Sequence, residues 1–529
     1  MRIHLRDIGW ALLSGLLLTL PFLDFSLAPL AWIALIPLIV TLSGRRTREG
    51  AVLGWLAGVV SGYGGMYWLA RVTVPGYGVL GFYLALYPAA WGGWISWLSR
   101  RRPGWIWWAA PAGWTALEYL RTYFLTGFPW NLLGISQARH LPLIQIASVT
   151  GVYGVSFLVV LANASLAGSI LAFRRRGART GRFFLHGYPV LVAALVIGAV
   201  WGCGYRVLLL DALKSTRGVP LRVALIQGGV LQELKWQPSR AADHLETYLG
   251  LSRQALASGP GLIIWPESAL PYYLEEQESV QRVLHRLAAG GNTYLLVGGD
   301  CRTRSAPRRF YNSAYLFSPA PSRWSRYDKI HLVPFGEYTP LKRIFPFLGR
   351  VVPWEEDFSA GEGISLMRMH HPNGPPAGGT EMGVLICFED IFPGLARKIA
   401  RRGASLLVNI TNDAWYGKTI APFQHAYAAV FRAVENGIYL ARATNTGYSC
   451  IIDPRGKVVG EVVDDKGEPL FISGWQTVEI YPTRSRSFYT GHGDIFSWIC
   501  IALALTASSG LTRFKINRVS FEQCRRGRG

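Results

Sequence analysis

The sequence has few charged residues for its length. Only 16% of its 529 residues are Asp, Glu, Lys or Arg, whereas about 25% is usual for soluble proteins. Half of the residues are hydrophobic. This composition excludes a wholly soluble protein. The apolar excess is concentrated in residues 8–210 and 495–511, and the stretch between them reads as a soluble domain.

Cysteine is also scarce, and its spacing excludes common metal sites. The six cysteines form no Cys-x-x-Cys pair and no other zinc-type pattern, so we expect neither a metal nor another cofactor. Cys203 and Cys500 fall in apolar segments, where a cysteine usually serves as a small hydrophobic residue. A disulfide between Cys301 and Cys450 remains open as an alternative.

Acidic residues are outnumbered, with 32 acidic against 54 basic side chains and a net charge of +22. A net charge of this size is typical of proteins that bind nucleic acid. The arginines, however, stand in short blocks between apolar segments, which is the pattern that orients a membrane protein. We therefore expect a lipid bilayer as a partner and no nucleic acid.

The apolar stretches predict a multi-pass membrane domain of about eight helices. A helix needs roughly 20 apolar residues to span a bilayer. No small-residue cleavage site follows the first stretch, so we expect a retained helix rather than a signal peptide. An N-terminal membrane domain would cover residues 1–210, followed later by one C-terminal helix. The expected segments are 8–25, 27–42, 51–70, 77–98, 105–125, 149–173, 188–210 and 495–511.

Glu118 and Arg121 are the charged pair within the fifth segment. They stand one helical turn apart, where opposite charges can meet. We interpret them as an interfacial ion pair at a helix end, with a substrate contact as the alternative.

The basic blocks predict the orientation of the chain. Every second loop is basic, and the loops between hold only Arg71 and Arg139. Basic loops stay in the cytoplasm, so both termini, including the tail 512–529, are expected there. Seven crossings before residue 211 then place residues 221–485 outside the cytoplasm. The blocks are Arg2 and Arg6; Arg45, Arg46 and Arg48; Arg100, Arg101 and Arg102; Arg174, Arg175, Arg176, Arg179 and Arg182; and Arg513, Lys515, Arg518, Arg525, Arg526 and Arg528.

Residues 221–485 predict an α/β domain, because short β-rich runs alternate with amphipathic stretches. Such sheets present functional side chains at the carboxyl ends of their strands. The expected strands are Arg222–Gln227, Leu262–Trp265, Tyr294–Gly298, Ser313–Phe317, Gly383–Cys387, Leu406–Ile410, Tyr448–Ile452 and Val458–Val463. The expected helices are Arg240–Ala257, Glu276–Ala289, Pro393–Arg402 and Gln424–Asn436.

Two long turn-rich stretches, 336–363 and 370–379, interrupt this pattern. Loops of this length inside a domain are usually functional or disordered. The first contains apolar residues between Ile344 and Trp354. We interpret it as a lid that touches lipid, with a loop packed on its own domain as the alternative.

Three reactive side chains lie beside short apolar runs. Cys387 ends one run, Glu267 follows another, and Lys329 stands before a turn. A thiol is a modest nucleophile until a base removes its proton, and Glu267 is the candidate general base. Lys329 and the backbone N–H that follows Cys387 could stabilise an oxyanion. The set predicts covalent acyl transfer through a thioester, which an amine attacks readily.

The motifs that carry these residues resemble a known superfamily. Trp265-Pro266-Glu267, Asp328-Lys329 with Pro334-Phe335-Gly336-Glu337, and Cys387-Phe388-Glu389 resemble the Glu-Lys-Cys signature of the nitrilase (carbon–nitrogen hydrolase) superfamily. With membrane helices on both sides, the whole chain resembles the membrane-anchored apolipoprotein N-acyltransferase family. The likeness includes Gln227-Gly228, Asn412-Asp413-Ala414-Trp415 and Arg442–Gly447. It implies an αββα sandwich attached to the membrane helices.

The resemblance also implies substrates and a location. The acyl donor would be a phospholipid, typically phosphatidylethanolamine, and the acceptor the diacylglyceryl-modified N-terminal cysteine of an apolipoprotein. The acyl chain would pass through a thioester on Cys387 in a ping-pong cycle. The protein would be a monomer in a bacterial inner membrane, with its catalytic domain in the periplasm.

Further site residues follow from the same likeness. Glu337 and Glu389 would be supporting carboxylates beside the triad, and Phe388 stands where the family commonly has a tyrosine. This departure removes a hydroxyl but keeps the backbone N–H. Weaker candidates either line the pocket or serve packing only: Trp236, Asn412 and Trp415.

Other functions remain open. His331 or His425 could instead form a Cys–His pair with the nucleophile. A membrane-tethered amidase or nitrilase-type hydrolase would pass the acyl group to water. A transporter or scaffold with an inactive enzyme domain is the third alternative, although the reactive residues are all present.

Overall fold

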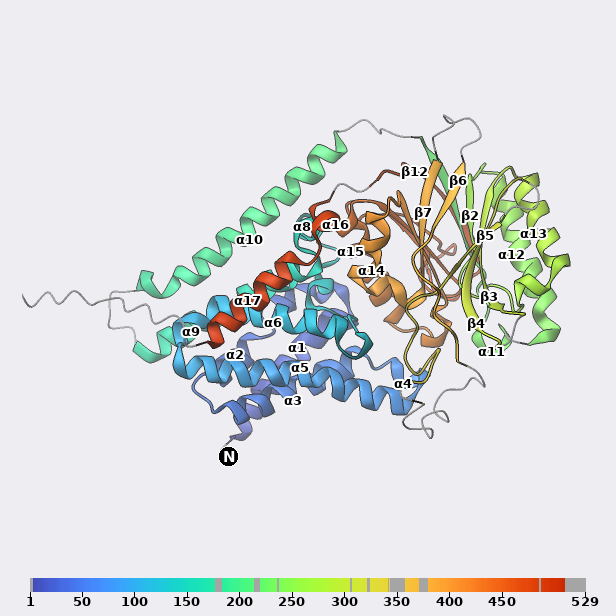
Figure 1. Ribbon diagram of the computed structural model, residues 1–529. Coiled ribbons are helices and arrows are strands. Elements are labelled where there is room, and N and C mark those ends of the chain that lie inside the picture. The colour runs from blue at the N-terminus through green and yellow to red at the C-terminus, as the bar shows by residue number, and fades with distance from the viewer. Residues whose placement is uncertain are drawn as a thin grey trace, which may run out of the picture.

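A computed structural model describes residues 3–176, 183–213, 219–235, 237–304, 307–320, 324–340, 342, 357–370, 379–484 and 487–509. Helices from both ends of the chain form one part of the molecule, and two stacked sheets with outer helices form the other (Figure 1). The expected combination of a helical membrane domain and an αββα domain is confirmed.

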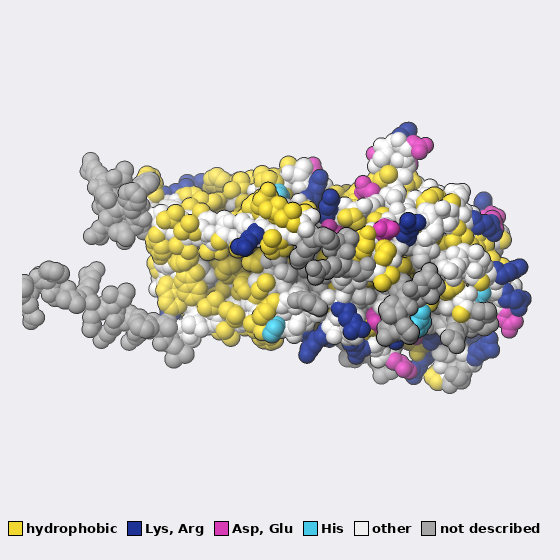
Figure 2. Space-filling model, turned by 90° about the horizontal axis from the view of Figure 1, so that it is seen from above, with side chains coloured by type: hydrophobic (Ala, Val, Ile, Leu, Met, Phe, Trp, Pro, Cys, Tyr) yellow, Lys and Arg dark blue, Asp and Glu magenta, His cyan; other side chains and the backbone are white. Residues whose placement is uncertain are grey.

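The helical part contains a helix at each expected segment. Figure 2 shows hydrophobic side chains covering this half of the molecule, in contrast to the charged half. The long helices are α1 (Leu5–Leu23), α3 (Thr47–Gly65), α5 (Val74–Arg101), α6 (Ile106–Tyr123), α9 (Val152–Arg176), α10 (Phe183–Ala212) and α17 (Ile495–Ser508). Between them lie η1 (Phe25–Trp32), α2 (Ile36–Leu42), α4 (Leu69–Val72), η2 (Pro103–Trp105), η3 (Phe124–Thr126), η4 (Leu133–Gln137), α7 (Leu141–Ile144) and α8 (Ala147–Thr150).

Within the described residues, four stretches are both long and apolar enough to cross a membrane: Leu5–Leu23, Phe25–Leu42, Val152–Arg174 and Gly187–Ala212. The C-terminal helix Ile495–Ser508 is apolar but shorter. These helices identify the chain as a membrane protein. The number of eight crossings, their orientation and the domain boundaries stay predictions.

A row of glycines lets α3 and α5 approach closely. A Cβ atom on Gly54 would lie 2.2 Å from the carbonyl oxygen of Pro88, and one on Gly58 would lie 2.8 Å from the Cα of Ala85. Small residues four apart are the usual means of bringing two membrane helices into backbone contact. The spacing of Gly50, Gly54, Gly58 and Gly62 therefore positions α3 against α5.

We expect Gly54→Val to destabilise the helical part by about 1–3 kcal/mol, the usual cost of overpacking a tight contact. The new side chain would overlap the Pro88 backbone, so α3 and α5 would have to separate. Thermal unfolding of the purified protein in detergent measures the effect. Gly198→Val on α10 is the matched control, because a Cβ there meets nothing within 4 Å. Equal melting temperatures for the two variants would contradict this account of the packing.

The expected ion pair between Glu118 and Arg121 is wrong. Glu118 is only 6% exposed, and its Oε1 accepts hydrogen bonds from Trp114 Nε1 at 3.0 Å and from the backbone N–H of Leu133 at 2.7 Å. The Arg121 guanidinium instead donates to the carbonyl oxygen of Trp130 at 3.2 Å. The two side chains thus use separate partners and line a cavity of about 80 Å³ inside the helical part.

Each of the two stacked sheets has six strands. The first runs β12 (Gly474–Ile480), β1 (Leu221–Gln227), β2 (Leu262–Ile264), β3 (Tyr294–Arg302), β4 (Phe310–Phe317), β5 (Trp324–Asp328). The second runs β11 (Val458–Glu461), β10 (Cys450–Ile452), β9 (Tyr439–Thr444), β8 (Leu406–Thr411), β7 (Gly379–Ile386), β6 (Leu366–His370). β1 to β3 are parallel, as are β7 to β9, and the outer strands pair antiparallel. All eight predicted strands are present, and β5, β6, β9 and β12 add to them.

Helices cover both outer faces of the paired sheets (Figure 1). On the first sheet lie α12 (Ala241–Leu256) and α13 (Glu278–Gly290); on the second lie α14 (Pro393–Arg401) and α15 (Ala421–Asn436). The short helix α11 (Gln232–Lys235) precedes α12. Side chains such as Leu225, Ile264 and Val384 form the core between the sheets. Cys301 in β3 and Cys450 in β10 are both free thiols, so the alternative disulfide is absent.

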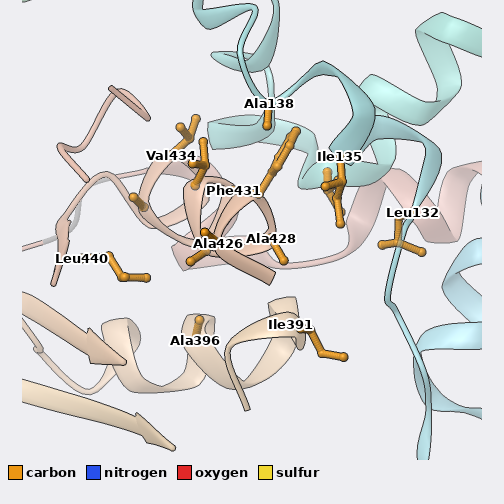
Figure 3. Packing of buried hydrophobic residues seen from close by; sticks show 14 of the residues in the cluster. Leu132, Ile135, Ala138, Ile391, Ala396, Ala426, Ala428, Phe431, Val434 and Leu440 are labelled. Carbon is orange, nitrogen blue, oxygen red and sulfur yellow. The ribbon is translucent and has the colours of Figure 1, made fainter. Parts of the chain in front are cut away.

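The helices on the second sheet attach the two-sheet domain, called the catalytic part below, to the membrane helices. Figure 3 shows Phe431 and Val434 of α15 in one apolar cluster with Leu132, Ile135 and Ala138 of the helical part. Buried hydrogen bonds add to this packing. Gln424 Oε1 accepts from Trp68 Nε1 at 3.0 Å and Trp130 Nε1 at 2.9 Å, while its Nε2 donates to the Phe22 carbonyl at 2.8 Å. The catalytic part is thereby held in a fixed position against the helices.

Candidate active site

Cys387 stands at the carboxyl end of β7, where the strand turns into the short helix η8 (Cys387–Ile391). Its φ is 52°, a strained conformation for a residue other than glycine and one that recurs at functional sites. Asn409 Nδ2 holds this backbone by donating to the carbonyl oxygens of Cys387 at 3.2 Å and Leu385 at 3.1 Å. Burial and the nearby Glu267 raise the pKa of the Cys387 thiol, whereas Lys329 lowers it. The thiol therefore needs a base to become a nucleophile.

Glu267 lies three residues beyond the end of β2 and is 6% exposed. Its Oε1 accepts from Asn312 Nδ2 at 2.7 Å, and its Oε2 accepts from the backbone N–H of Asn412 at 2.8 Å. Both carboxylate oxygens are thus fixed in place. The charge of Glu267 acts on the Cys387 thiol, as the pKa shift of that thiol records.

Lys329 follows directly after β5 and is 1% exposed. Its Nζ lies 2.8 Å from Glu337 Oε1 and 3.7 Å from Glu267 Oε1. Burial alone would lower the pKa of Lys329, but Glu337 and Glu267 together raise it above its ordinary value. Lys329 therefore stays an ammonium beside Cys387. Glu337 is fixed in turn by the backbone N–H of Val333, which donates to its Oε2 at 2.8 Å.

Glu389 joins the nucleophile turn to the segment that carries Lys329. Its Oε1 accepts from the backbone N–H groups of Ile330 at 2.8 Å and His331 at 3.0 Å, and its Oε2 accepts from that of Ile386 at 2.8 Å. Burial raises the pKa of Glu389 to about 7, against the opposing effect of these donors. Glu389 thus supports the site structurally.

Phe388 presents an apolar face toward the membrane helices. It is 5% exposed. Its ring centroid lies 5.9 Å from that of Phe128, which belongs to the helical part, and 5.2 Å from that of Phe392. The residue after the nucleophile therefore packs at the junction of the two parts.

Neither histidine has a contact with Cys387 that would make a Cys–His pair. His331 lies with its ring centroid 3.9 Å from that of Phe392, and burial together with Lys329 lowers its pKa to about 4. His425 is fully buried, with Nδ1 3.0 Å from Asp413 Oδ1 and Nε2 2.7 Å from Asp390 Oδ1. Both nitrogens of His425 are occupied by carboxylates.

The weaker candidates have different surroundings. The side chain of Asn412 is tied to two others, because its Nδ2 donates to Gln232 Oε1 at 2.9 Å and its Oδ1 accepts from Asn445 Nδ2 at 3.1 Å. Trp415 is 41% exposed. Trp236 and the apolar segment 344–354, the proposed lid, lie outside the described residues.

Several residues of the site escaped the sequence analysis. Asn312 and Asn409 are buried in strands, where a polar side chain is itself a signal because it needs a partner. Tyr416 lies close enough to Cys387 for the two side chains to interact electrostatically. Arg442, which the sequence analysis named only as part of a motif, forms a buried cluster with Asp390 at 2.8 Å and Asp413 at 2.9 Å.

The arrangement brings a thiol, a carboxylate and an ammonium together in one buried site. These are the groups that acyl transfer through a thioester needs. In the described part of the chain, no cluster of three or more His, Cys, Asp or Glu side chains is arranged to hold a metal ion.

Known proteins are similar to both parts of the chain. Residues 14–165 match the apolipoprotein N-acyltransferase N-terminal domain, and residues 222–484 match the carbon-nitrogen hydrolase family. A relative named apolipoprotein N-acyltransferase from Geobacter metallireducens is 40% identical over 521 residues, which cover 95% of each chain. Relatives with the same name from Nitrosomonas europaea and Methylococcus capsulatus are 34% and 33% identical, over 86% and 93% of this chain and 87% and 93% of theirs.

Proposed function

Because this chain belongs to the apolipoprotein N-acyltransferase family, we propose that it moves a fatty acyl chain from a phospholipid to the N-terminus of a lipoprotein precursor. The donor is phosphatidylethanolamine, and the acceptor is the α-amino group of a cysteine that already carries a diacylglyceryl group. The observation that carries this proposal is the meeting of Glu267, Lys329 and Cys387 in one buried site beside the membrane helices.

In the first half-reaction Glu267 takes the proton of the Cys387 thiol, and the sulfur attacks the carbonyl carbon of the phospholipid ester. The oxyanion that forms is stabilised by the Lys329 ammonium and by the backbone N–H after Cys387. Its collapse breaks the ester C–O bond. Glu267 returns the proton to the leaving oxygen, a lysophospholipid departs, and the acyl chain remains on sulfur as a thioester.

In the second half-reaction the amine of the acceptor attacks the thioester carbonyl. A C–N bond forms, and Glu267 accepts a proton from the attacking nitrogen. The C–S bond then breaks, the proton passes to the sulfur, and the product is an amide with the thiol restored. Glu337 supports this cycle by fixing Lys329, with which its carboxylate pairs at 2.8 Å.

The membrane helices serve the chemistry by letting both substrates keep their acyl chains in lipid. A soluble enzyme would have to extract those chains at a cost of about 0.8 kcal/mol per CH₂. The buried bonds of Gln424 to Trp68 and Trp130 support a catalytic site held at the bilayer surface. We place the protein as a monomer in a bacterial inner membrane, with the catalytic part in the periplasm and both termini in the cytoplasm.

The test is an incubation of purified protein in detergent with acyl-labelled phosphatidylethanolamine and a synthetic diacylated lipopeptide. We expect the label to appear on the lipopeptide amine in equal amount to the lysophospholipid released. Free labelled fatty acid without acylated peptide would instead identify a membrane-tethered hydrolase. A second lipopeptide with an acetylated α-amino group is the matched control, and it should accept no label.

A further inference from the structure

A second lysine is buried beside Glu267. Lys235 ends the short helix α11 and is only 2% exposed. Its Nζ donates to the backbone carbonyl oxygen of Glu267 at 3.1 Å, and no ion pair of Lys235 occurs in the part of the chain that the structure describes. A buried ammonium without a paired carboxylate is costly. Its retention at this position needs an explanation that packing alone does not give.

The charges around Lys235 belong to the active site. Its ammonium interacts with the negative charges of Glu267 and Asp300 and with Cys387. Asp300, in β3, is 7% exposed and accepts a hydrogen bond from Ser268 Oγ at 3.2 Å. Burial raises the pKa of Asp300 to about 7, and Lys235 opposes this rise. Lys235 is thus a second cation, besides Lys329, whose charge acts on Glu267 and Cys387.

The same short helix is also linked, through Asn412, to the carboxylate of Glu267. Gln232, at the start of α11, accepts a hydrogen bond from Asn412 Nδ2 at 2.9 Å, and the backbone N–H of Asn412 donates to Glu267 Oε2 at 2.8 Å. Lys235 holds the carbonyl of the same glutamate. Helix α11 therefore fixes the candidate base at both its backbone and its carboxylate.

We propose that Lys235 is a positioning residue for Glu267: its hydrogen bond to the Glu267 carbonyl orients the base, and its buried ammonium balances the negative charge that forms on Cys387 when the thiol gives up its proton. This role rests on the function proposed above. The site carries the carboxylates of Glu267, Glu337 and Asp300 close together, and Lys329 is already paired with Glu337. Without Lys235, the negative charges gathered here would have one cation fewer to balance them as the thiol ionises.

The proposal makes a specific statement about pH. Burial lowers the pKa of Lys235 to about 8, while Glu267, Asp300 and Cys387 oppose this. Above pH 8 Lys235 loses its proton, and its charge no longer acts on the site. Below pH 8 the ammonium favours loss of the Cys387 thiol proton, so Cys387 reacts at lower pH than it would without Lys235.

The experiment compares the wild type with Lys235→Met and Lys235→Arg. Methionine fills similar space without charge, and arginine keeps the charge throughout the accessible pH range. Two rates are measured from pH 5 to 10: alkylation of Cys387 by the neutral reagent chloroacetamide, and release of lysophospholipid from phosphatidylethanolamine without acceptor. The thermal midpoint of each variant is recorded alongside.

For Lys235→Met we expect the pH of half-maximal rate to rise by about one unit for both reactions, in line with the usual effect of a nearby charge. The rate at pH 7 should fall about tenfold. In Lys235→Arg both rates below pH 8 should equal those of the wild type, and the change in rate near pH 8 should be absent. A wild-type pH profile in Lys235→Met would overturn the proposal. If that variant does not fold, a transition near pH 8 that persists in Lys235→Arg would overturn it equally.

The two rates separate the outcomes. Chloroacetamide reports on the charge around Cys387 whatever the natural substrate is. Failure of lysophospholipid release in the wild type would therefore refute the proposed function and leave the alkylation profiles as the test of Lys235.

Discussion

Cys387→Ala is expected to form no acyl-enzyme and to lose N-acylation to below one part in 10⁴ of the wild-type rate, an estimate from the usual weight of a covalent nucleophile. The remaining site would keep Glu267, Lys329 and their hydrogen bonds. Without the sulfur, however, no group in the described site could take the acyl chain. Radiolabel transfer from phosphatidylethanolamine to the lipopeptide measures the loss.

Cys203→Ala is the matched control for this variant. Cys203 is a free and exposed thiol on α10, so its removal should leave transfer unchanged. Transfer that persists in Cys387→Ala at more than a trace level would contradict the covalent mechanism. Cys387→Ser should likewise form no acyl-enzyme, because a hydroxyl is a much weaker nucleophile than a thiol in the same turn.

Glu267→Gln is expected to lower kcat by about 10²–10⁴-fold, the usual contribution of a general acid–base group. The amide has nearly the same shape, and it can still accept a hydrogen bond from Asn312 or the backbone N–H of Asn412. It cannot take the thiol proton. Because the change removes a proton acceptor and keeps the shape of the side chain, KM should change little, and both half-reactions should slow.

Pre-steady-state release of lysophospholipid and transfer from preformed acyl-enzyme measure the two half-reactions separately. Glu246→Gln is the matched control, since the side chain of Glu246 is 65% exposed and, among the described residues, pairs only with Arg253 at 2.6 Å. A loss confined to KM in Glu267→Gln would mean that Glu267 binds substrate rather than transfers protons.

The sequence was most informative where a reactive residue ends a strand. Cys387 follows directly after β7 and Glu267 stands three residues beyond β2, and both strands were predicted; Lys329 follows β5, which was not. Local sequence predicts such positions, because an apolar run ends at a polar residue. It also predicted the helical segments, since the length of an apolar stretch limits what it can form.

Contacts between distant segments could not be predicted in the same way. Asn312 bonds to Glu267 and Glu337 only because β4 lies beside β5 and near the end of β2 in the folded sheet. Strands β5 and β6 lie at sheet edges, where the apolar pattern is weak, and both were missed. Glu118 and Arg121 were expected to pair because they are neighbours on a helix, but longer-range partners compete for both.

The most direct test of the central claim is mass spectrometry of the intact protein after incubation with phosphatidylethanolamine of one defined acyl chain and no acceptor. The account predicts one added acyl group, located on the peptide that contains Cys387 and removed by hydroxylamine or by the diacylated lipopeptide. An unmodified protein that still acylates the lipopeptide when both substrates are present, or an acyl group on another residue, would contradict it.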